Sequence, residues 1–190
     1  MLAVGFNRRL SPAVEAVRAA LPSSDPRVVL YRVAAGVLPE KHWYHDRRQG
    51  GRLLGEVCHF VDTASALIGA DPVDVTAIGA GRPHETLLAD DLSVTLRYPD
   101  GSMAVIVYTS AAGGYGKEYV EVLTGSSRAV IKDYRSAEVN GKKLWKGRQD
   151  KGHRAAVAQF KADVLRGRSE VLPSSIATSR ATIAAAASLL

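Results

Sequence analysis

The chain has 190 residues, of which 46% are apolar and 23% are charged, and its formal net charge is +6. This composition is typical of a globular domain and excludes a disordered or low-complexity chain. The single cysteine, Cys58, excludes an intrachain disulfide and a metal site built from cysteines. Such sparse use of cysteine fits the cytoplasm, where we expect the protein. No apolar run reaches the roughly 20 residues of a membrane span.

The N-terminal third predicts a helix, a strand and a long loop. Ser11 followed by Pro12 is a typical helix start, and apolar residues at helical spacing continue to Leu21. Residues 28–33 are β-branched and aromatic, which favours a strand. The pattern is lost over residues 34–49, where we expect a long loop of the kind that is often functional.

A helix is predicted over residues 52–68, with its end at Gly69. Its apolar stripe comprises Leu53, Val57, Phe60 or Val61, Ala64 and Leu67. The periodicity then changes from helical spacing to alternation, which indicates strands with one dry face. Strands are predicted over residues 92–98, 103–108, 119–123, 129–133, 137–139 and 142–145, and helices over residues 151–166 and 174–190.

Hairpin-linked strands flanked by helices predict an α+β fold, with a mostly antiparallel open sheet and helices packed on one face. The other face of the sheet would be half apolar, a common setting for oligomer contact, so we expect a homo-oligomer. No strand is followed by a Gly-x-Gly-x-x-Gly pattern, so we expect the Rossmann domain and its cofactor-binding residues to be absent. Residues 1–190 are treated as one domain.

Polar residues lie opposite the apolar stripe of the predicted helix 52–68: Arg52, Glu56, His59, Asp62 and Thr63. His59 has a carboxylate one turn away on either side, and such partners can fix the tautomer of an imidazole and raise its basicity. Alcohol oxidation needs a base of near-neutral pKa that takes the hydroxyl proton as hydride leaves. A solvated polar face with an ordinary histidine fits the same spacing.

A second cluster, in the predicted loop, is His42, Trp43, Tyr44, His45 and Asp46. Its spacing lacks the helical geometry of a zinc motif and no further ligands are evident, so no metal is expected. Flat aromatic faces beside hydrogen-bonding groups suit a sugar. A loop that packs its aromatic rings against the sheet is the alternative.

The remaining candidates are basic. Asn7, Arg8 and Arg9 follow a short apolar run, and adjacent arginines can hold an anion, although surface charge is an equal interpretation. Lys117, beside Glu118, is a weaker candidate. Basic residues are otherwise scattered without interleaved aromatics, so no nucleic-acid partner is expected.

Three segments resemble the glucose–fructose oxidoreductase / inositol dehydrogenase / MocA (Gfo/Idh/MocA) family: residues 4–12 (VGFNRRLSP), 42–46 (HWYHD) and 50–62 (GGRLLGEVCHFVD). Residues 98–102 and 152–154 also lie where family members have similar turns and helix starts. The resemblance implies a C-terminal α+β domain that supplies the substrate wall and an oligomer-forming sheet. It also implies an N-terminal Rossmann domain that binds NAD or NADP, from which residues 1–10 would be the remaining link.

The resemblance further implies that His59 is the acid/base. The family commonly has an Asp four residues before this histidine, where this chain has Gly55, and Glu56 next to it is the expected second catalytic residue. The expected substrate-binding residues are Asn7, Arg8, Arg9, His42, Trp43, His45 and Lys117.

We therefore expect the substrate-binding domain of an NAD(P)-dependent oxidoreductase acting on a sugar or cyclitol hydroxyl or carbonyl. Hydride transfer requires the nicotinamide held against the substrate, so activity would need a Rossmann partner, which a separate subunit would supply if the enzyme is split. Whether this chain is itself an enzyme stays open. The alternative is a non-enzymatic oligomerisation or ligand-binding module left after loss of the cofactor domain.

Overall fold

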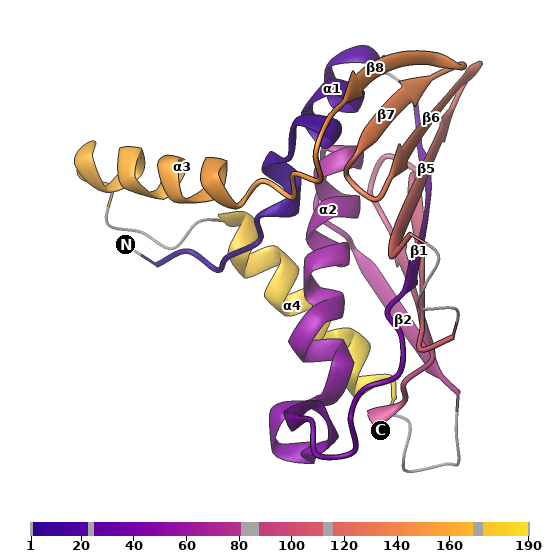
Figure 1. The fold of residues 1–190 in the computed structure, drawn as a ribbon, viewed down its shortest axis with the longest axis vertical. Coiled ribbons are helices and arrows are strands. Elements are labelled where there is room, and N and C mark those ends of the chain that lie inside the picture. The colour runs from indigo at the N-terminus through magenta and orange to yellow at the C-terminus, as the bar shows by residue number, and fades with distance from the viewer. Residues whose placement is uncertain (1, 23–24, 81–87, 112–115, 169–172, 190) are drawn as a thin grey trace.

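A computed structural model describes residues 2–22, 25–80, 88–111, 116–168 and 173–189. The described residues form one eight-stranded sheet with helices on one face, which confirms the predicted α+β fold (Figure 1). The strands are β1 (Val28–Ala34), β2 (Asp74–Gly79), β3 (Leu92–Arg97), β4 (Met103–Thr109), β5 (Glu118–Thr124), β6 (Ser127–Lys132), β7 (Ser136–Val139) and β8 (Lys142–Lys146). Strand β2 was not predicted.

The strand order in the sheet is β2-β3-β4-β1-β5-β6-β7-β8. Every neighbouring pair is antiparallel except β1 with β4, whose parallel register pairs Val28 with Met103. The first strand of the chain therefore lies in the middle of the sheet, antiparallel to β5 with Tyr31 opposite Val120. This placement brings the Tyr31 side chain to Glu118 at the start of β5.

The helices are α1 (Pro12–Ala20), α2 (Cys58–Ile68), α3 (His153–Leu165) and α4 (Pro173–Ala187). Ser11 caps α1 as predicted, since its hydroxyl accepts a hydrogen bond of 3.1 Å from the Val14 amide. Shorter helical segments are η1 (Arg8–Leu10), η2 (Trp43–His45), η3 (Arg47–Gln49) and the π-helix η4 (Leu53–Val57). The predicted helix 52–68 is thus a π-helix that continues into α2.

The core lies between the sheet and its helices. The predicted apolar stripe of η4 and α2 is fully buried, from Leu53 to Leu67, and α1 packs beside it. Helix α4 contacts α2 and β2, whereas α3 projects away from the rest of the molecule and rests on η1 (Figure 1). None of the described helices has the length and hydrophobicity needed to cross a membrane.

The opposite face of the sheet is half apolar, as predicted. Its middle strands expose Leu30, Met103, Val107 and Leu123, because alternate residues of a strand point to opposite faces. Charged residues lie among and around these positions, including the ion pair of Arg97 with Asp74.

Candidate active site

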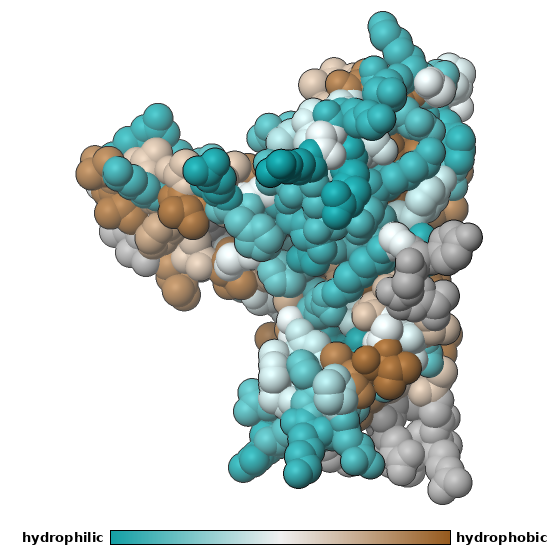
Figure 2. Space-filling view, viewed as in Figure 1, coloured by the Kyte–Doolittle hydropathy of each residue, from teal (hydrophilic) through white to brown (hydrophobic). Residues whose placement is uncertain are grey.

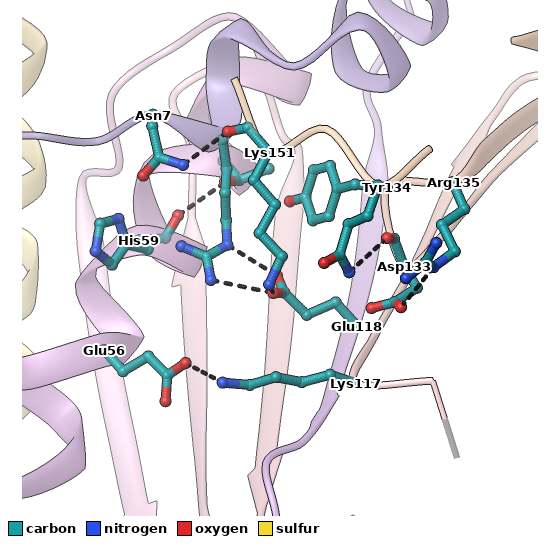
Figure 3. Close-up of polar contacts among 12 residues, drawn as sticks. Asn7, Glu56, His59, Lys117, Glu118, Asp133, Tyr134, Arg135 and Lys151 are labelled. Atoms are coloured by element: carbon teal, nitrogen blue, oxygen red, sulfur yellow. Dashed lines mark hydrogen bonds and ion pairs between the residues drawn. The ribbon is translucent and has the colours of Figure 1, made fainter. Parts of the chain in front are cut away.

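A buried carboxylate, Glu118, holds the N-terminal segment against the sheet (Figure 3). The Arg8 guanidinium donates to both of its oxygens, at 2.9 and 3.0 Å, and the Lys151 ammonium donates at 2.5 Å. The Tyr31 hydroxyl donates a further hydrogen bond of 2.6 Å. Burial alone would raise the pKa of Glu118, but its hydrogen bonds and ion pairs with Arg8 and Lys151 outweigh burial and lower the pKa to about 2.

The turn between β6 and β7 extends this network. The Tyr134 hydroxyl lies 2.7 Å from the Tyr31 hydroxyl and is fully buried. Asp133 and Tyr134 have φ angles of 49° and 53°, the left-handed region that non-glycine residues seldom adopt. This strained turn places the Tyr134 side chain in the interior, where its hydroxyl meets that of Tyr31.

Both adjacent arginines are occupied by carboxylates of the protein itself. Arg8 is paired with Glu118, and the Arg9 guanidinium lies 2.8 Å from the buried carboxylate of Asp62 on α2. The anions that these two arginines bind in the structure are therefore carboxylates of the same domain. In the structure these two residues anchor η1 to β5 and to α2.

Asn7 joins the same segment to the start of α3. Its side-chain amide donates to the Lys151 carbonyl at 2.7 Å and lies 3.2 Å from Nε2 of His153. Gly152, whose φ is 82°, lies against the backbone of this segment, and a Cβ there would lie 2.4 Å from the Asn7 carbonyl oxygen. The close approach of these two backbones therefore requires glycine at position 152.

His59 lies on α2 beside this segment (Figure 3). The ring of Phe6 meets it edge-on, with 5.8 Å between centroids, and its Nδ1 is buried without a hydrogen-bond partner in the described part of the chain. Burial, followed by the positive charge of Arg8, lowers the pKa of His59 to about 4. At neutral pH the side chain is therefore a neutral imidazole.

The charge of Glu56 raises the pKa of His59 as predicted, but burial and the charge of Arg8 outweigh it. Asp62 is bonded to Arg9 and to the Thr178 hydroxyl of α4, and the carboxylate of Glu56 is bonded to other side chains. Neither raises the basicity of the imidazole above its ordinary value, because burial and the nearby guanidinium prevail. The polar helix face is also not solvated, since Arg52, Asp62 and Thr63 are buried.

Glu56 lies one turn before His59 and takes part in a second polar cluster. Its carboxylate accepts a hydrogen bond of 2.5 Å from the Tyr108 hydroxyl and forms an ion pair with Lys117 (Figure 3). Arg52 donates to the same tyrosine oxygen at 2.7 Å. Burial would raise the pKa of Glu56, but Lys117 and Tyr108 outweigh it and lower the pKa, so Glu56 is a carboxylate at neutral pH.

The loop of the second predicted cluster is packed on the π-helix. The Tyr44 hydroxyl donates to the Gly55 carbonyl at 3.1 Å, and a Cβ at Gly55 would lie only 2.2 Å from the Tyr44 ring. With the Tyr44 ring in this position there is no room for a side chain at position 55, where the family resemblance predicts Asp. His42 stacks with Trp43 at 5.8 Å and its Nδ1 accepts from the Tyr44 amide, while Trp43 and His45 remain exposed.

The predicted residues thus fall into three neighbouring groups: Asn7, Arg8 and Arg9 around η1, Glu56 with Lys117, and His42, Trp43 and His45 on the loop tied to Gly55. Tyr108 and Lys151 were not predicted as site residues, and the π-helix was not predicted either. The Lys117–Glu118 pair was a weak candidate because it stands isolated in the sequence, and the structure shows that the partners of Glu118 are distant along the chain. No local periodicity marks such residues.

The domain is therefore an open eight-stranded sheet with helices on one face, and its helix α2 carries the partly buried His59. Residues 23–147 match the family described as GFO/IDH/MocA C-terminal domain. The chain therefore belongs to the Gfo/Idh/MocA family, which confirms the resemblance. Among curated proteins, none matches this sequence.

Solved structures share the fold. UDP-N-acetylglucosamine 3-dehydrogenase GnnA from Acidithiobacillus ferrooxidans has a TM-score of 0.73 and 18% identity, covering 100% of this chain and 62% of that one. The aldose-aldose oxidoreductase from Caulobacter crescentus has a TM-score of 0.68 and 18% identity, covering 94% and 60%. GenD2 from gentamicin A biosynthesis, in complex with NAD, has a TM-score of 0.70 and 20% identity, covering 97% and 60%. The chain spans about three fifths of the length of these structures.

Proposed function

We propose that this chain is the substrate-binding domain of an NAD(P)-dependent oxidoreductase that acts on a hydroxyl or carbonyl group of a sugar or cyclitol. The observation that carries the proposal is His59, a neutral imidazole on α2 beside Glu56 and the N-terminal segment. Family membership supports the reaction class, and the named relatives act on a nucleotide-linked sugar and on aldoses.

In this proposal each group of side chains has its own task. His59, which is neutral at pH 7, accepts the hydroxyl proton during oxidation and returns it during reduction. With a pKa of about 4 it is a weaker base than the near-neutral one that the sequence predicts. The Glu56–Lys117 pair orients the substrate through the partly exposed ammonium group, and Trp43 and His45 form an exposed wall for the sugar. Asn7 holds the first turn of α3 in place, with Arg8 and Arg9 as anchors.

The nicotinamide supplies the hydride chemistry when it is bound, and this chain does not fit that cofactor on its own. The sequence has no glycine-rich phosphate loop between a strand and a helix. We therefore propose that a Rossmann domain, on a separate subunit or elsewhere in a longer protein, carries NAD or NADP. Residues 1–190 would be one domain, with residues 1–10 leading to that partner.

Exposed apolar surface supports such a partner. Helix α3 projects from the body with Val157, Phe160 and Leu165 exposed by 70%, 42% and 76% (Figure 2). Between α3 and the N-terminal segment lies a groove of about 490 Å³ whose lining is mainly apolar and includes Val4 and Phe6. Contiguous apolar surface of this kind marks an interaction site, and we assign it to the proposed Rossmann partner.

The experiment is reconstitution with the Rossmann domain encoded next to or upstream of this chain. NAD and NADP reduction would be followed with a panel of aldoses, cyclitols and nucleotide-linked sugars. We expect turnover with the pair, and a fall of about 100-fold or more for His59→Ala. Full activity of that variant contradicts the assigned base. A complex that forms without turnover on any substrate favours the non-enzymatic binding module.

A further inference from the structure

A second cavity lies near the first turn of α3, and it has no role in the function proposed above. It has a volume of about 490 Å³ and lies between the end of β8, the segment 147–152 and the first turn of α3. Its lining includes Trp145, Arg148, Lys151, His153 and Arg154. Four of these five side chains are basic, on a chain whose net charge is +6.

The charge available to a ligand comes from two arginines. Arg148 and Arg154 are exposed, and neither forms an ion pair with any residue in the described part of the chain. Asp150 also borders the cavity, but its carboxylate accepts the Gly152 amide at 2.8 Å. The Lys151 ammonium is turned inward to Glu118. Two unpaired guanidinium groups on one cavity are a typical arrangement for binding phosphate.

A further donor is available from His153. The Asn7 amide must direct its nitrogen to the Lys151 carbonyl, at 2.7 Å, so the contact of 3.2 Å to Nε2 of His153 uses that imidazole nitrogen as an acceptor. The proton of a neutral His153 is then on Nδ1, where it can be donated to an anion. Asn7 thereby connects this cavity to the segment that packs against His59.

One wall of the cavity is aromatic. Trp145 is partly buried, and Gly147 lies so close to its ring that a Cβ there would be 3.1 Å from Cζ2. The ring packs against the core on one side and lines the same cavity as the two arginines. A planar ligand group can stack on such a surface, with a gain of about 1–3 kcal/mol for a nucleic-acid base.

We propose that this cavity binds a nucleotide, with its phosphates on Arg148 and Arg154 and its base against Trp145. The site goes beyond the function proposed above, since it requires neither His59 nor a Rossmann partner. The nucleotide is either free or the nucleotide part of a larger ligand such as a nucleotide-linked sugar. Both sources present the same phosphate and base to the cavity.

The test uses the full chain and the fluorescence of Trp145. Trp43→Phe leaves Trp145 as the single tryptophan, because the sequence has two. Titration with ADP and UDP should change the fluorescence in a saturable manner, and pyrophosphate should compete. UDP-glucose is compared with UDP by calorimetry on the unsubstituted chain, because Trp43 belongs to the proposed sugar wall. Tighter binding of UDP-glucose than of UDP indicates the larger ligand, and equal binding indicates the free nucleotide.

Two double variants distinguish binding of the nucleotide in this cavity from non-specific attraction to basic surface residues. Arg148→Gln with Arg154→Gln should weaken ADP binding about tenfold or more, as expected for lost charged hydrogen bonds. Lys142→Gln with Lys143→Gln removes the same amount of charge from the neighbouring edge strand β8, outside the cavity, and should leave affinity within roughly twofold. Trp145→Leu, measured by calorimetry, should weaken ADP binding but not pyrophosphate binding.

The proposal is overturned if neither ADP nor UDP binds saturably, or if both pairs of variants weaken binding equally. Binding of single-stranded DNA in preference to nucleotides would also overturn it. All four substituted basic residues are exposed, and a thermal unfolding curve for each variant would confirm that it folds.

Discussion

The Arg8 guanidinium spans both carboxylate oxygens of Glu118, at 2.9 and 3.0 Å, in the interior of the domain. The two residues are 110 positions apart, so the pair fastens the N-terminal segment to the middle of the sheet. A buried charge that loses its partner is left without solvation, which makes the pair costly to break. Asn7, which bonds to the start of α3, is held in place by the same contact.

We expect Glu118→Ala to lower the free energy of unfolding by about 3–5 kcal/mol, because it leaves Arg8 buried and unpaired. The measurement is urea denaturation. The matched control is Glu121→Ala, which removes a carboxylate from the same strand but from a partly exposed ion pair with Arg128. The control should lose about 1 kcal/mol or less. Equal losses of unfolding free energy in the two variants would show that the buried pair stabilises the domain no more than the partly exposed pair.

The Glu118 pair should also make the domain acid-sensitive. The pKa of Glu118 falls from its ordinary value of 4.5 to about 2 in the folded protein. A lowered carboxylate pKa contributes stability that is present above pH 4.5 and is lost as the pH falls towards 2. Urea midpoints measured between pH 7 and pH 2.5 should show this decline. In Glu118→Gln, which does not titrate, the decline should be shallower.

His59 should contribute over a higher pH range. Its pKa falls from 6.5 to about 4 in the fold, so the folded state disfavours the protonated imidazole. The unfolded chain then binds more protons between these values, and stability is lost as the pH falls from 6.5 to 4. NMR titration of the His59 ring, assigned with His59→Gln, should give a midpoint near 4. A midpoint near 6.5 would contradict the buried position of Nδ1.

The packing of Tyr44 on Gly55 predicts an unusual mutant cycle. Gly55→Ala should destabilise the protein, since the new Cβ would clash with the ring at 2.2 Å. In a Tyr44→Ala background the same substitution should stabilise it by roughly 0.5–1 kcal/mol, because alanine favours helices over glycine. Unfolding free energies of the four proteins test this reversal. The same sign in both backgrounds would mean that the ring does not rest on Gly55.

The half-apolar face of the sheet predicts self-association. Leu30 and Val107 are exposed on neighbouring strands, in a surface that a second copy could cover. Replacing both with Asp should shift the protein towards the monomer in sedimentation velocity experiments, because charge would be buried at the interface. Thr76→Asp with Thr95→Asp, near the β2 edge of the same sheet, is the control. An unchanged mass for the Leu30 and Val107 variant would exclude this face.

Local patterns determined much of the fold. The cap at Ser11, the alternation in β3 and β4 and the turn at residues 140–141 lie where they were predicted, because each depends on neighbours a few positions away. The same patterns identified the helix that carries His59. Its π-helical start, Leu53–Val57, was not predicted, because the spacing of apolar residues does not distinguish a π-helical turn from an α-helical one.

Only the tertiary structure decided what surrounds the site. The sequence by itself determined most of the helices and strands, though not β2 or the π-helix, and which face of each predicted element is apolar, since these follow from spacing along the chain. It did not determine that β1 lies between β4 and β5, that Arg8 is paired with Glu118, or that burial lowers the pKa of His59. These depend on contacts between distant segments, which form only when the whole chain closes around one core.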